Sequence, residues 1–534
     1  MKKKYKYLLS LASGLLLAAG WTPHGFPFLL FVAFVPLLVV ENEHFISKDK
    51  NHSFGIFIYA FVAFFIWNTL TCWWIYNAAF VGLAAAVLIN STFMGIVIWL
   101  FHVVRRRWTF NKYGHIAFIA FWITFEFLHS RWDLNWPHMN LGHGFGAYPQ
   151  VIQWYEYTGF FGGTLWILVG NVLVFTLAYH IFMCKEHYKL YKKRLIATLA
   201  WIIIPVFVSL LIFNTYKEKK NPLNIVVVQP NLDPYTQQYT LEPTAVAEKM
   251  MHMAFEKVDS TTKLILLPES AIQEYVYETD FDFSPSIKLM RGYLKKTPQI
   301  QIVSGMSSIK LFKKGEKLSN TARKMTDSEQ YYDGYNTALL ISSDSANYQK
   351  YHKSKLVAGV EQTPFISHFK FLEKYALDFG GIVGSIGKDS IPAIFTLKNG
   401  VKISPVICFE SSFGEYVAKF IRRGAQAIVV ITNEGWWGNT SGHRQFLYNT
   451  AIRAIETRRC IARSANTGTS CFINQRGEVQ QPTLYWTQDV IKQNINLNDK
   501  ITFYVRYGDY IGRFFLFFSA FFAVFILFDF FKTK

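Results

Sequence analysis

Charge is what this sequence has least of. Only 17 % of its 534 residues are charged, whereas a soluble domain carries roughly 25 %. So few charges leave little to cover the surface of a water-soluble protein, which argues against a single soluble enzyme and against a disordered chain. The length also exceeds one hydrophobic core, because single cores stop growing near about 250–300 residues. More than one domain is therefore predicted.

Cysteine is also scarce, and the motifs of metal and nucleotide sites are missing. The five cysteines form no C-x-x-C pair and no Cys/His cluster at zinc spacing, which argues against a structural metal and a disulfide scaffold. No glycine-rich phosphate loop of the familiar spacings is present. The sequence therefore predicts no bound metal.

Long apolar runs, by contrast, are abundant. A helix needs about 20 apolar residues to cross the hydrocarbon core of a membrane. Eight runs are candidates, although the first, second and fifth are short: 7–21, 26–40, 54–76, 80–104, 116–128, 160–184, 196–213 and 510–531. The first run also resembles a secretory signal peptide, but a second apolar run follows it closely, which favours a retained helix. We predict a multi-pass bundle of about eight transmembrane helices.

The basic residues indicate how this bundle is oriented. The net charge of +19 is typical of proteins that bind nucleic acid or an anionic membrane face. If the N-terminus is cytoplasmic, almost all lysines and arginines of the bundle fall on inside segments, and the short outside loops hold only Arg131. This asymmetry matches the positive-inside rule. It predicts cytoplasmic termini, an external segment before the last helix, and no nucleic-acid partner.

The segment between the last two predicted helices has a different pattern. Short β-branched runs at 224–230, 264–270, 301–306, 335–341, 403–410 and 427–433 alternate with helical patterns at 245–258, 413–423 and 443–459. Such alternation predicts an α/β domain. A hairpin is expected around Arg476 and Gly477. The predicted domains are a bundle at 1–215, an α/β domain at 221–505 and a last helix at 508–534.

Three reactive side chains follow strands of this α/β domain. Cys408 lies where a buried strand gives way to a predicted helix, whose N-terminus would favour the thiolate. Glu269 could accept the thiol proton, and Lys353 could stabilise negative charge on an attacked carbonyl. A lone buried cysteine is more often inert core, and a single Glu or Lys after a strand is more often solvated. These residues alone therefore leave the site open.

The order in which these motifs occur identifies a protein family more specifically than any one of the motifs alone. Pro268-Glu269 is followed by YHKSKLV, then ICFE, then NEGWWG, an order that resembles the carbon–nitrogen hydrolase (nitrilase) superfamily. With its flanking helices, the whole chain resembles the membrane-embedded branch, the apolipoprotein N-acyltransferases. The resemblance implies an αββα sandwich outside the membrane bundle. It also implies a catalytic triad of Glu269, Lys353 and Cys408.

Several further positions match the family and are implied to support catalysis or bind substrate: Glu361, Glu410, Asn336 and Trp436. The chain departs from the family pattern after the lysine, where AGVEQTP replaces a common PFGE. Phe409 follows the nucleophile where the family often has tyrosine. A family tryptophan after the first strand aligns only with Tyr235 or Tyr239, and we take Tyr239 as the candidate.

The resemblance implies a bacterial inner-membrane enzyme with its catalytic domain on the periplasmic side. Its acyl donor would be a membrane phospholipid and its acceptor the amine of a diacylglyceryl-cysteine lipoprotein, with a thioester between them. A monomer without cofactor is expected. We further predict an interfacial lid at 361–379 and an entrance loop at 130–150. The alternatives are a membrane-anchored amidase or nitrilase, and a transporter or receptor with an external ligand-binding domain.

Overall fold

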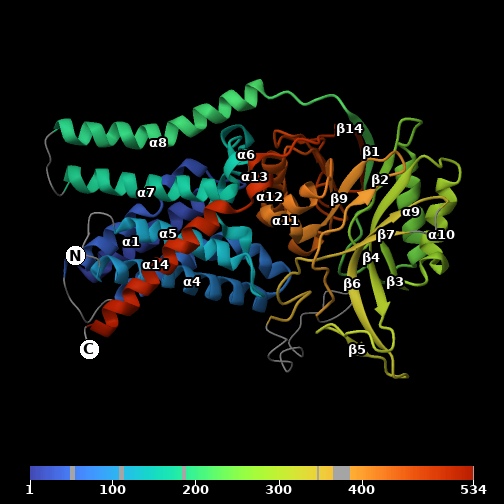
Figure 1. Ribbon diagram of the computed structural model, residues 1–534, viewed down its shortest axis with the longest axis horizontal. Helices are drawn as coiled ribbons and strands as arrows, with labels where there is room; N and C mark the ends of the chain where they lie inside the picture. The colour runs from blue at the N-terminus through green and yellow to red at the C-terminus, as the bar shows by residue number, and fades with distance from the viewer. Residues whose placement is uncertain (48–53, 108–113, 183–187, 345–347, 365–384, 533–534) are drawn as a thin grey trace.

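The computed structural model describes residues 1–47, 54–107, 114–182, 188–344, 348–364 and 385–532. These residues form two parts, a bundle of long helices and an α/β sandwich, which lie end to end (Figure 1). The predicted combination of a helical membrane bundle and an external α/β domain is confirmed. Most of the predicted lid, residues 365–379, lies outside the described residues.

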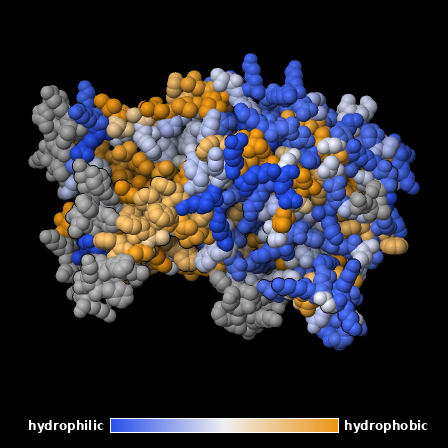
Figure 2. Space-filling view, in the orientation of Figure 1, coloured by the Kyte–Doolittle hydropathy of each residue, from blue (hydrophilic) through white to orange (hydrophobic). Residues whose placement is uncertain are grey.

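Each of the eight predicted apolar runs contains a helix within the described residues. Five helical segments have the length and composition to cross a membrane: 27–46, 55–77, 80–107, 160–182 and 191–215. The bundle consists of α1 (Lys3–Ala19), α2 (Val35–Ile46), α3 (Gly55–Cys72), α4 (Phe80–Arg107), α5 (His115–His129), α7 (Phe160–Phe182), α8 (Tyr188–Thr215) and α14 (Tyr510–Lys532). Apolar residues cover much of its outer surface, whereas hydrophilic residues dominate the sandwich (Figure 2). Such a surface suits lipid, so this is a membrane protein.

Both chain termini lie at the end of the bundle that is farthest from the sandwich (Figure 1). The basic C-terminus of α4 lies there too, since the Arg107 guanidinium donates to the Ile526 carbonyl of α14. At the opposite end, the turn η3 (Trp73–Asn77) that follows α3 meets the turn η11 (Gly435–Trp437) of the sandwich. The bundle therefore has one basic end with both termini and one end that carries the α/β domain.

The sandwich contains two mixed sheets. The first has the order β14-β1-β2-β4-β6-β5, with β3 beside β4 and β7 beside β6, and the second has the order β13-β12-β11-β10-β9-β8. Parallel pairs form the centre of each sheet, β1-β2-β4 in one and β9-β10-β11 in the other. The first sheet comprises β1 (Pro222–Gln229), β2 (Leu264–Leu266), β3 (Ile272–Tyr277), β4 (Gln301–Leu311), β5 (Arg323–Lys324), β6 (Tyr331–Ile341), β7 (Gln349–His352) and β14 (Asp489–Asn496). The second comprises β8 (Phe395–Thr396), β9 (Lys402–Ile407), β10 (Ala427–Thr432), β11 (Ile461–Ala465), β12 (Cys471–Ile473) and β13 (Val479–Gln480).

Successive side chains of each strand point to opposite faces of its sheet, and this alternation forms the layers of the sandwich. Ile225 and Val227 of β1 belong to the core between the sheets, whereas Val226 and Val228 pack against α9 (Pro243–Phe255) and α10 (Pro285–Leu294). Burying each such side chain contributes about 1.5–3 kcal/mol. On the other side, α11 (Gly414–Arg422) and α12 (Ser441–Thr457) cover the second sheet. The result is the predicted αββα sandwich, and β12 and β13 form the predicted hairpin.

Helix α12 is shared between the two parts of the molecule. Its Ala451 and Ala454 belong to the sandwich core, while Ile452 and Ile455 belong to the core of the bundle. Fourteen of its 17 residues are buried, although its sequence is not strongly apolar. The α/β domain is therefore packed against the bundle along a whole helix.

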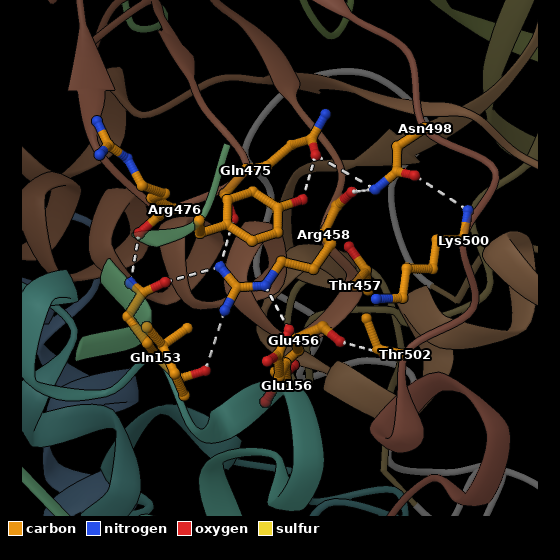
Figure 3. A network of polar contacts seen from close by, with 12 residues as sticks. Gln153, Glu156, Glu456, Thr457, Arg458, Gln475, Arg476, Asn498, Lys500 and Thr502 are labelled. Atoms are coloured by element: carbon orange, nitrogen blue, oxygen red, sulfur yellow. Dashed lines mark hydrogen bonds and ion pairs between the residues drawn. The ribbon is translucent and has the colours of Figure 1, made fainter. Parts of the chain in front are cut away.

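A polar network fixes the C-terminal end of this helix (Figure 3). Arg458, in the left-handed conformation with φ of 49°, ends α12. Its guanidinium donates to Glu156 Oε2 at 2.6 Å and to Gln153 Oε1 at 2.7 Å, and also to the Gln475 carbonyl at 3.0 Å. Gln153 and Glu156 precede and begin α6 (Tyr155–Thr158) in the bundle, whereas Gln475 lies in the β12–β13 turn. This buried arginine therefore joins the sandwich to the bundle.

Candidate active site

The three predicted catalytic residues follow strands of both sheets. Glu269 lies three residues after β2, Lys353 directly follows β7, and Cys408 directly follows β9. Because β2 and β7 belong to the first sheet and β9 to the second, the three side chains meet between the sheets. Lys353 is 1 % exposed and Glu269 is 7 % exposed, so their charges interact with little screening by water.

The lysine is held between two carboxylates. Lys353 Nζ lies 3.1 Å from Glu269 Oε1 and 2.8 Å from Glu361 Oε1. Asn336 Nδ2, on β6, donates to the same two oxygens at 2.7 and 3.0 Å. Burial alone would lower the pKa of Lys353, but Glu269 and Glu361 outweigh burial and raise it well above its usual value. The lysine is therefore a permanent cation.

Backbone donors orient both carboxylates. Glu269 Oε2 accepts the Asn433 N–H at 3.1 Å, and Glu361 Oε2 accepts the Val357 N–H at 2.9 Å. Each carboxylate thus has one oxygen on the lysine and one on the backbone. This arrangement keeps Glu269 in position to act as a base.

The predicted nucleophile lies at a constrained turn. Cys408 begins the turn η10 (Cys408–Ser412) with φ of 47°, a left-handed conformation that is rare for a residue with a side chain. Burial and the charge of Glu269 together raise the pKa of its thiol to about 12, against the opposing effects of Lys353 and a hydrogen bond with Thr432. A thiol with this pKa is protonated at pH 7, so its use as a nucleophile requires a base that takes its proton.

Glu410 connects the segment after β7, which contains Lys353, to the turn η10, which contains Cys408. Its Oε1 accepts the Tyr351 hydroxyl at 2.5 Å and the Ser354 N–H at 2.7 Å, and its Oε2 accepts the Ile407 N–H at 2.9 Å. Burial raises the pKa of Glu410 to about 7. The contacts make it a positioning residue that holds Lys353 and Cys408 at a fixed separation.

An apolar cavity of about 330 Å³ connects Cys408 to the bundle. One wall consists of small and apolar residues of α4, including Val81, Gly82 and Ala85. The other walls come from the α/β domain, from the turn after α3 and from the loop after α5: Phe409, Trp437, Phe446, Trp74 and Trp136. The cavity can hold a hydrocarbon chain with its end at the thiol.

Comparison with known families agrees with this geometry. The sequence model described as carbon–nitrogen hydrolase matches residues 225–502, which is more than half of the chain. The chain belongs to the carbon–nitrogen hydrolase family. A second sequence model, described as the N-terminal domain of apolipoprotein N-acyltransferase, matches residues 13–173.

Two similar proteins match this carbon–nitrogen hydrolase over both of its parts, and a solved structure matches it over about half of the chain. A protein of Chlorobaculum tepidum named apolipoprotein N-acyltransferase is 28 % identical, over 95 % of this chain and 93 % of its own length. One of the same name from Geobacter metallireducens is 25 % identical, over 94 % and 92 %. A solved amidase of the nitrilase superfamily from Nesterenkonia is 17 % identical with a TM-score of 0.36, over 55 % of this chain and 96 % of its own. The matches to both sequence models, and to proteins of this name over more than nine-tenths of both chains, identify this chain as an acyltransferase.

Of the other residues predicted for the carbon–nitrogen hydrolase site, one lines the acyl cavity and two contact aromatic residues of the α/β domain. Phe409 lines the cavity beside Cys408. Trp436 contacts Tyr235, with ring centroids 5.1 Å apart, whereas Tyr239 stacks on Tyr275 at 6.4 Å. The tryptophan in the cavity wall is the next residue, Trp437, whose ring lies 4.5 Å from that of Phe446. The roles of Trp436 and Tyr239 stay predictions.

Part of the predicted entrance loop forms the cavity wall, and its histidines fix the loop. Leu134, Asn135 and Trp136 line the cavity. His138 shares a hydrogen bond of 2.7 Å with Gln445 of α12, and His143 shares one of 3.0 Å with the Pro137 carbonyl. Sequence reasoning missed the cavity tryptophans 74, 136 and 437 because they lie far apart in the chain. Asn433 was the last residue of a predicted strand, but no pattern in the sequence indicates that its backbone N–H donates to Glu269.

The strand beside Glu269 requires glycine, which gives a testable prediction. A Cβ on Gly305 of β4 would lie 2.7 Å from Glu269 Cα and 2.8 Å from the Ser270 nitrogen. Since both are backbone atoms, Gly305→Ala has to displace Glu269, and we expect acylation of Cys408 to fall about tenfold or more. The matched control is Gly292→Ala in α10, where nothing lies within 4 Å. It should leave acylation unchanged and raise the free energy of unfolding slightly. Equal rates for both variants would show that the position of Glu269 is not limiting.

Proposed function

We propose that this protein transfers an acyl chain from a membrane phospholipid to the N-terminal amine of a diacylglyceryl-cysteine lipoprotein, through a thioester on Cys408. The observation that carries the proposal is the apolar cavity, which is lined both by Cys408 and by residues of α4 in the bundle. A soluble amide has no use for such a cavity, whereas an acyl chain fills it. The names of the similar proteins specify transfer of an acyl group to a nitrogen of an apolipoprotein, and a membrane phospholipid is the acyl donor that we propose.

The first half-reaction forms the thioester. Glu269 takes the proton of Cys408 as the sulfur attacks the ester carbonyl carbon of the phospholipid. The ammonium of Lys353 lies close enough to stabilise the negative oxygen that forms. The intermediate then collapses: its bond to the glycerol oxygen breaks, and Glu269 returns the proton to that oxygen. A lysophospholipid leaves, and the acyl chain remains on Cys408.

The second half-reaction passes the acyl chain to the amine. The neutral amine of the lipoprotein attacks the thioester carbonyl, and Glu269 accepts one of its protons. The carbon–sulfur bond breaks, and the sulfur regains a proton from Glu269. An amide forms, and the free thiol is restored. Because the two substrates use the same cavity in turn, the kinetics are ping-pong.

Attachment of the catalytic domain to the membrane bundle avoids the free-energy cost of moving an acyl chain from lipid into water. Drawing an acyl chain out of lipid costs about 0.8 kcal/mol per CH₂, so roughly 12 kcal/mol for a chain of about 16 carbons. A cavity that begins at lipid-facing helices keeps the chain in apolar surroundings throughout. The fixed contact of α12 with both parts supports this arrangement.

We further propose that the enzyme is a monomer in a bacterial inner membrane, with both termini cytoplasmic and the α/β domain periplasmic. The basic end of the bundle, with both termini, supports this orientation under the positive-inside rule. The proposed division is a bundle at 1–215, a catalytic domain at 221–505 and a closing helix at 508–534.

Trapping the intermediate tests the proposed function. The purified protein is incubated with a phospholipid that carries labelled acyl chains, and intact mass is recorded before and after hydroxylamine. We expect one labelled acyl group on Cys408, lost with hydroxylamine. A diacylglyceryl lipopeptide with a free N-terminal amine should then discharge it to an N-acylated product. The control is the same lipopeptide with an acetylated amine, which should not discharge it. Consumption of soluble amides without a lipid-derived thioester would instead support an amidase.

A further inference from the structure

A second cavity, of about 270 Å³, lies beside the catalytic centre at the junction of the two parts. Arg131 at the outer end of α5 and Asp509 just before α14 line it from the bundle. Lys355 and the first residues of α11 line it from the α/β domain. Helix α5 ends and helix α14 begins beside this cavity. The cavity therefore lies where the apolar bundle meets the polar domain.

The charges of this cavity do not balance within the protein. Arg131 binds Glu415 and Asp509 at 2.6 Å each, and Arg513 binds Glu415 at 2.9 Å. These two cations and two anions satisfy one another. Two cations remain, Lys355 and Lys419. Within the described part of the chain, neither ammonium forms an ion pair with a carboxylate.

Lys355 is held there despite its unfavourable surroundings. Its ammonium lies 5.1 Å from the ring centre of Phe413 and 5.7 Å from that of Tyr416, and Lys419 lies 6.0 Å from Tyr416. Burial and the like charges of Lys419, Arg131 and Lys388 lower the pKa of Lys355 to about 8, although Glu410 acts in the opposite direction. A bound anion would relieve this repulsion, since opposite charges close to an ammonium favour its charged form.

Further groups at the cavity are hydrogen-bond donors. Helix α11 begins with Gly414, Glu415 and Tyr416, and the N-terminus of a helix attracts anions. The Ser412 side chain also lines the cavity, is fully buried, and its hydroxyl has no hydrogen-bond partner among the described residues. Two ammonium groups, a hydroxyl and a helix N-terminus are the donor set that proteins use for phosphate.

The cavity is also close to the reacting ester. Lys355 follows Lys353 by two residues, and its backbone N–H donates to Glu410, the residue that joins the lysine and cysteine turns. The ring of Phe413, in the wall of this cavity, lies 5.1 Å from the ring of Phe409, in the wall of the acyl cavity. In a glycerophospholipid the phosphate is only a few bonds from the ester carbonyls. One lipid can therefore place its acyl chain in the first cavity and its phosphate in the second.

We infer that Lys355 and Lys419 form a phosphate subsite, in which the head-group phosphate of the acyl donor binds while its ester lies at Cys408. This inference rests on the proposed function, because it assigns the head group of the same donor. It makes the phosphate, rather than the rest of the head group, the feature by which the donor is selected.

The test measures a ratio of rates. Formation of the thioester is followed by intact mass with two donors of identical acyl chains, phosphatidylglycerol and diacylglycerol, in the same detergent. The full-length protein should favour phosphatidylglycerol. In the Lys355→Gln/Lys419→Gln variant this preference should fall at least tenfold, whereas Lys419→Arg, which keeps the charge, should retain it. The control is Lys314→Gln/Lys317→Gln, which removes two charges from an exposed turn and should keep the full preference.

The ratio separates this inference from the proposed function and from misfolding. A variant that is partly unfolded loses rate with both donors alike and keeps its preference, so a preference that stays unchanged in Lys355→Gln/Lys419→Gln overturns the subsite. If the full-length protein forms no thioester with either donor, it is the proposed function that fails.

A second arm identifies the source of the phosphate. Inorganic phosphate alone is titrated against the protein, and its effect on acylation by phosphatidylglycerol is measured. Competition that disappears in Lys355→Gln/Lys419→Gln supports a subsite shared with the head group. Binding of inorganic phosphate to Lys355 and Lys419 without any effect on acylation would show a site for a soluble anion and would overturn the assignment to the donor.

Discussion

Replacing Cys408 by alanine is expected to abolish the lipid-derived thioester and to lower acyl transfer at least about 1,000-fold. The reason is that Cys408 is the thiol at the end of the apolar cavity and its sulfur carries the acyl group between the two substrates. Without it, water or the amine would have to attack the phospholipid ester directly. The measurement is the intact mass of the variant after incubation with labelled phospholipid, together with the rate of N-acylation of a lipopeptide.

Other buried cysteines provide matched controls for this substitution. Cys460 and Cys471 lie in the core of the α/β domain, and burial raises the pKa of each thiol to about 12, as it does for Cys408. Cys460→Ala and Cys471→Ala should form the thioester at the rate of the unaltered protein once the folded fraction is taken into account. A labelled acyl group that persists in Cys408→Ala would place the nucleophile elsewhere and refute the proposed mechanism.

Much of the fold could be predicted from the sequence because apolar periodicity is a local signal. The eight apolar runs each contain a helix of the bundle, and the short β-branched runs contain β1, β2, β4, β6, β9 and β10. Helix α12 shows where local signals end. The sequence predicts only a helical pattern at 443–459, whereas in the structure the helix is buried between the second sheet and the bundle, because residues of both cores lie on it. Burial from two sides depends on the tertiary arrangement, which no window of sequence contains.

The candidate site was predictable to a different degree. Strand ends and residue types suggested Glu269, Lys353 and Cys408, but only the resemblance to a family joined them. That Asn336 and Lys353 each contact both Glu269 and Glu361 follows from the pairing of β6 with β7 and β4. The walls of the acyl cavity come from more than four segments that lie far apart in the chain, so its residues share no motif. Gly305 looked like any glycine in a strand until the neighbouring Glu269 backbone was in place.

Replacing Lys353 by methionine is the second substitution with a large expected effect, a loss of about 100- to 1,000-fold in acylation of Cys408. Methionine keeps much of the side-chain volume but leaves Glu269 and Glu361 without the cation that lies 3.1 and 2.8 Å from them. Removing one partner of a buried ion pair costs about 3–5 kcal/mol, so thermal unfolding should also occur at lower temperature. The control is Lys350→Met on the same strand, whose partly exposed ammonium binds Glu278; it should retain most of the rate.

A double variant separates the two roles of this lysine. In Lys353→Met, Asn336 Nδ2 is the only group left among the described residues that contacts both carboxylates, and no cation there offsets the repulsion between their two negative charges. Lys353→Met/Glu361→Gln removes that second negative charge and should regain most of the lost unfolding temperature. Its acylation rate should nevertheless stay low, because no cation remains to stabilise the oxygen of the attacked carbonyl. If the rate returned together with the stability, Lys353 would act only by neutralising Glu361, and the stabilisation of the reacting ester would have to come from other groups.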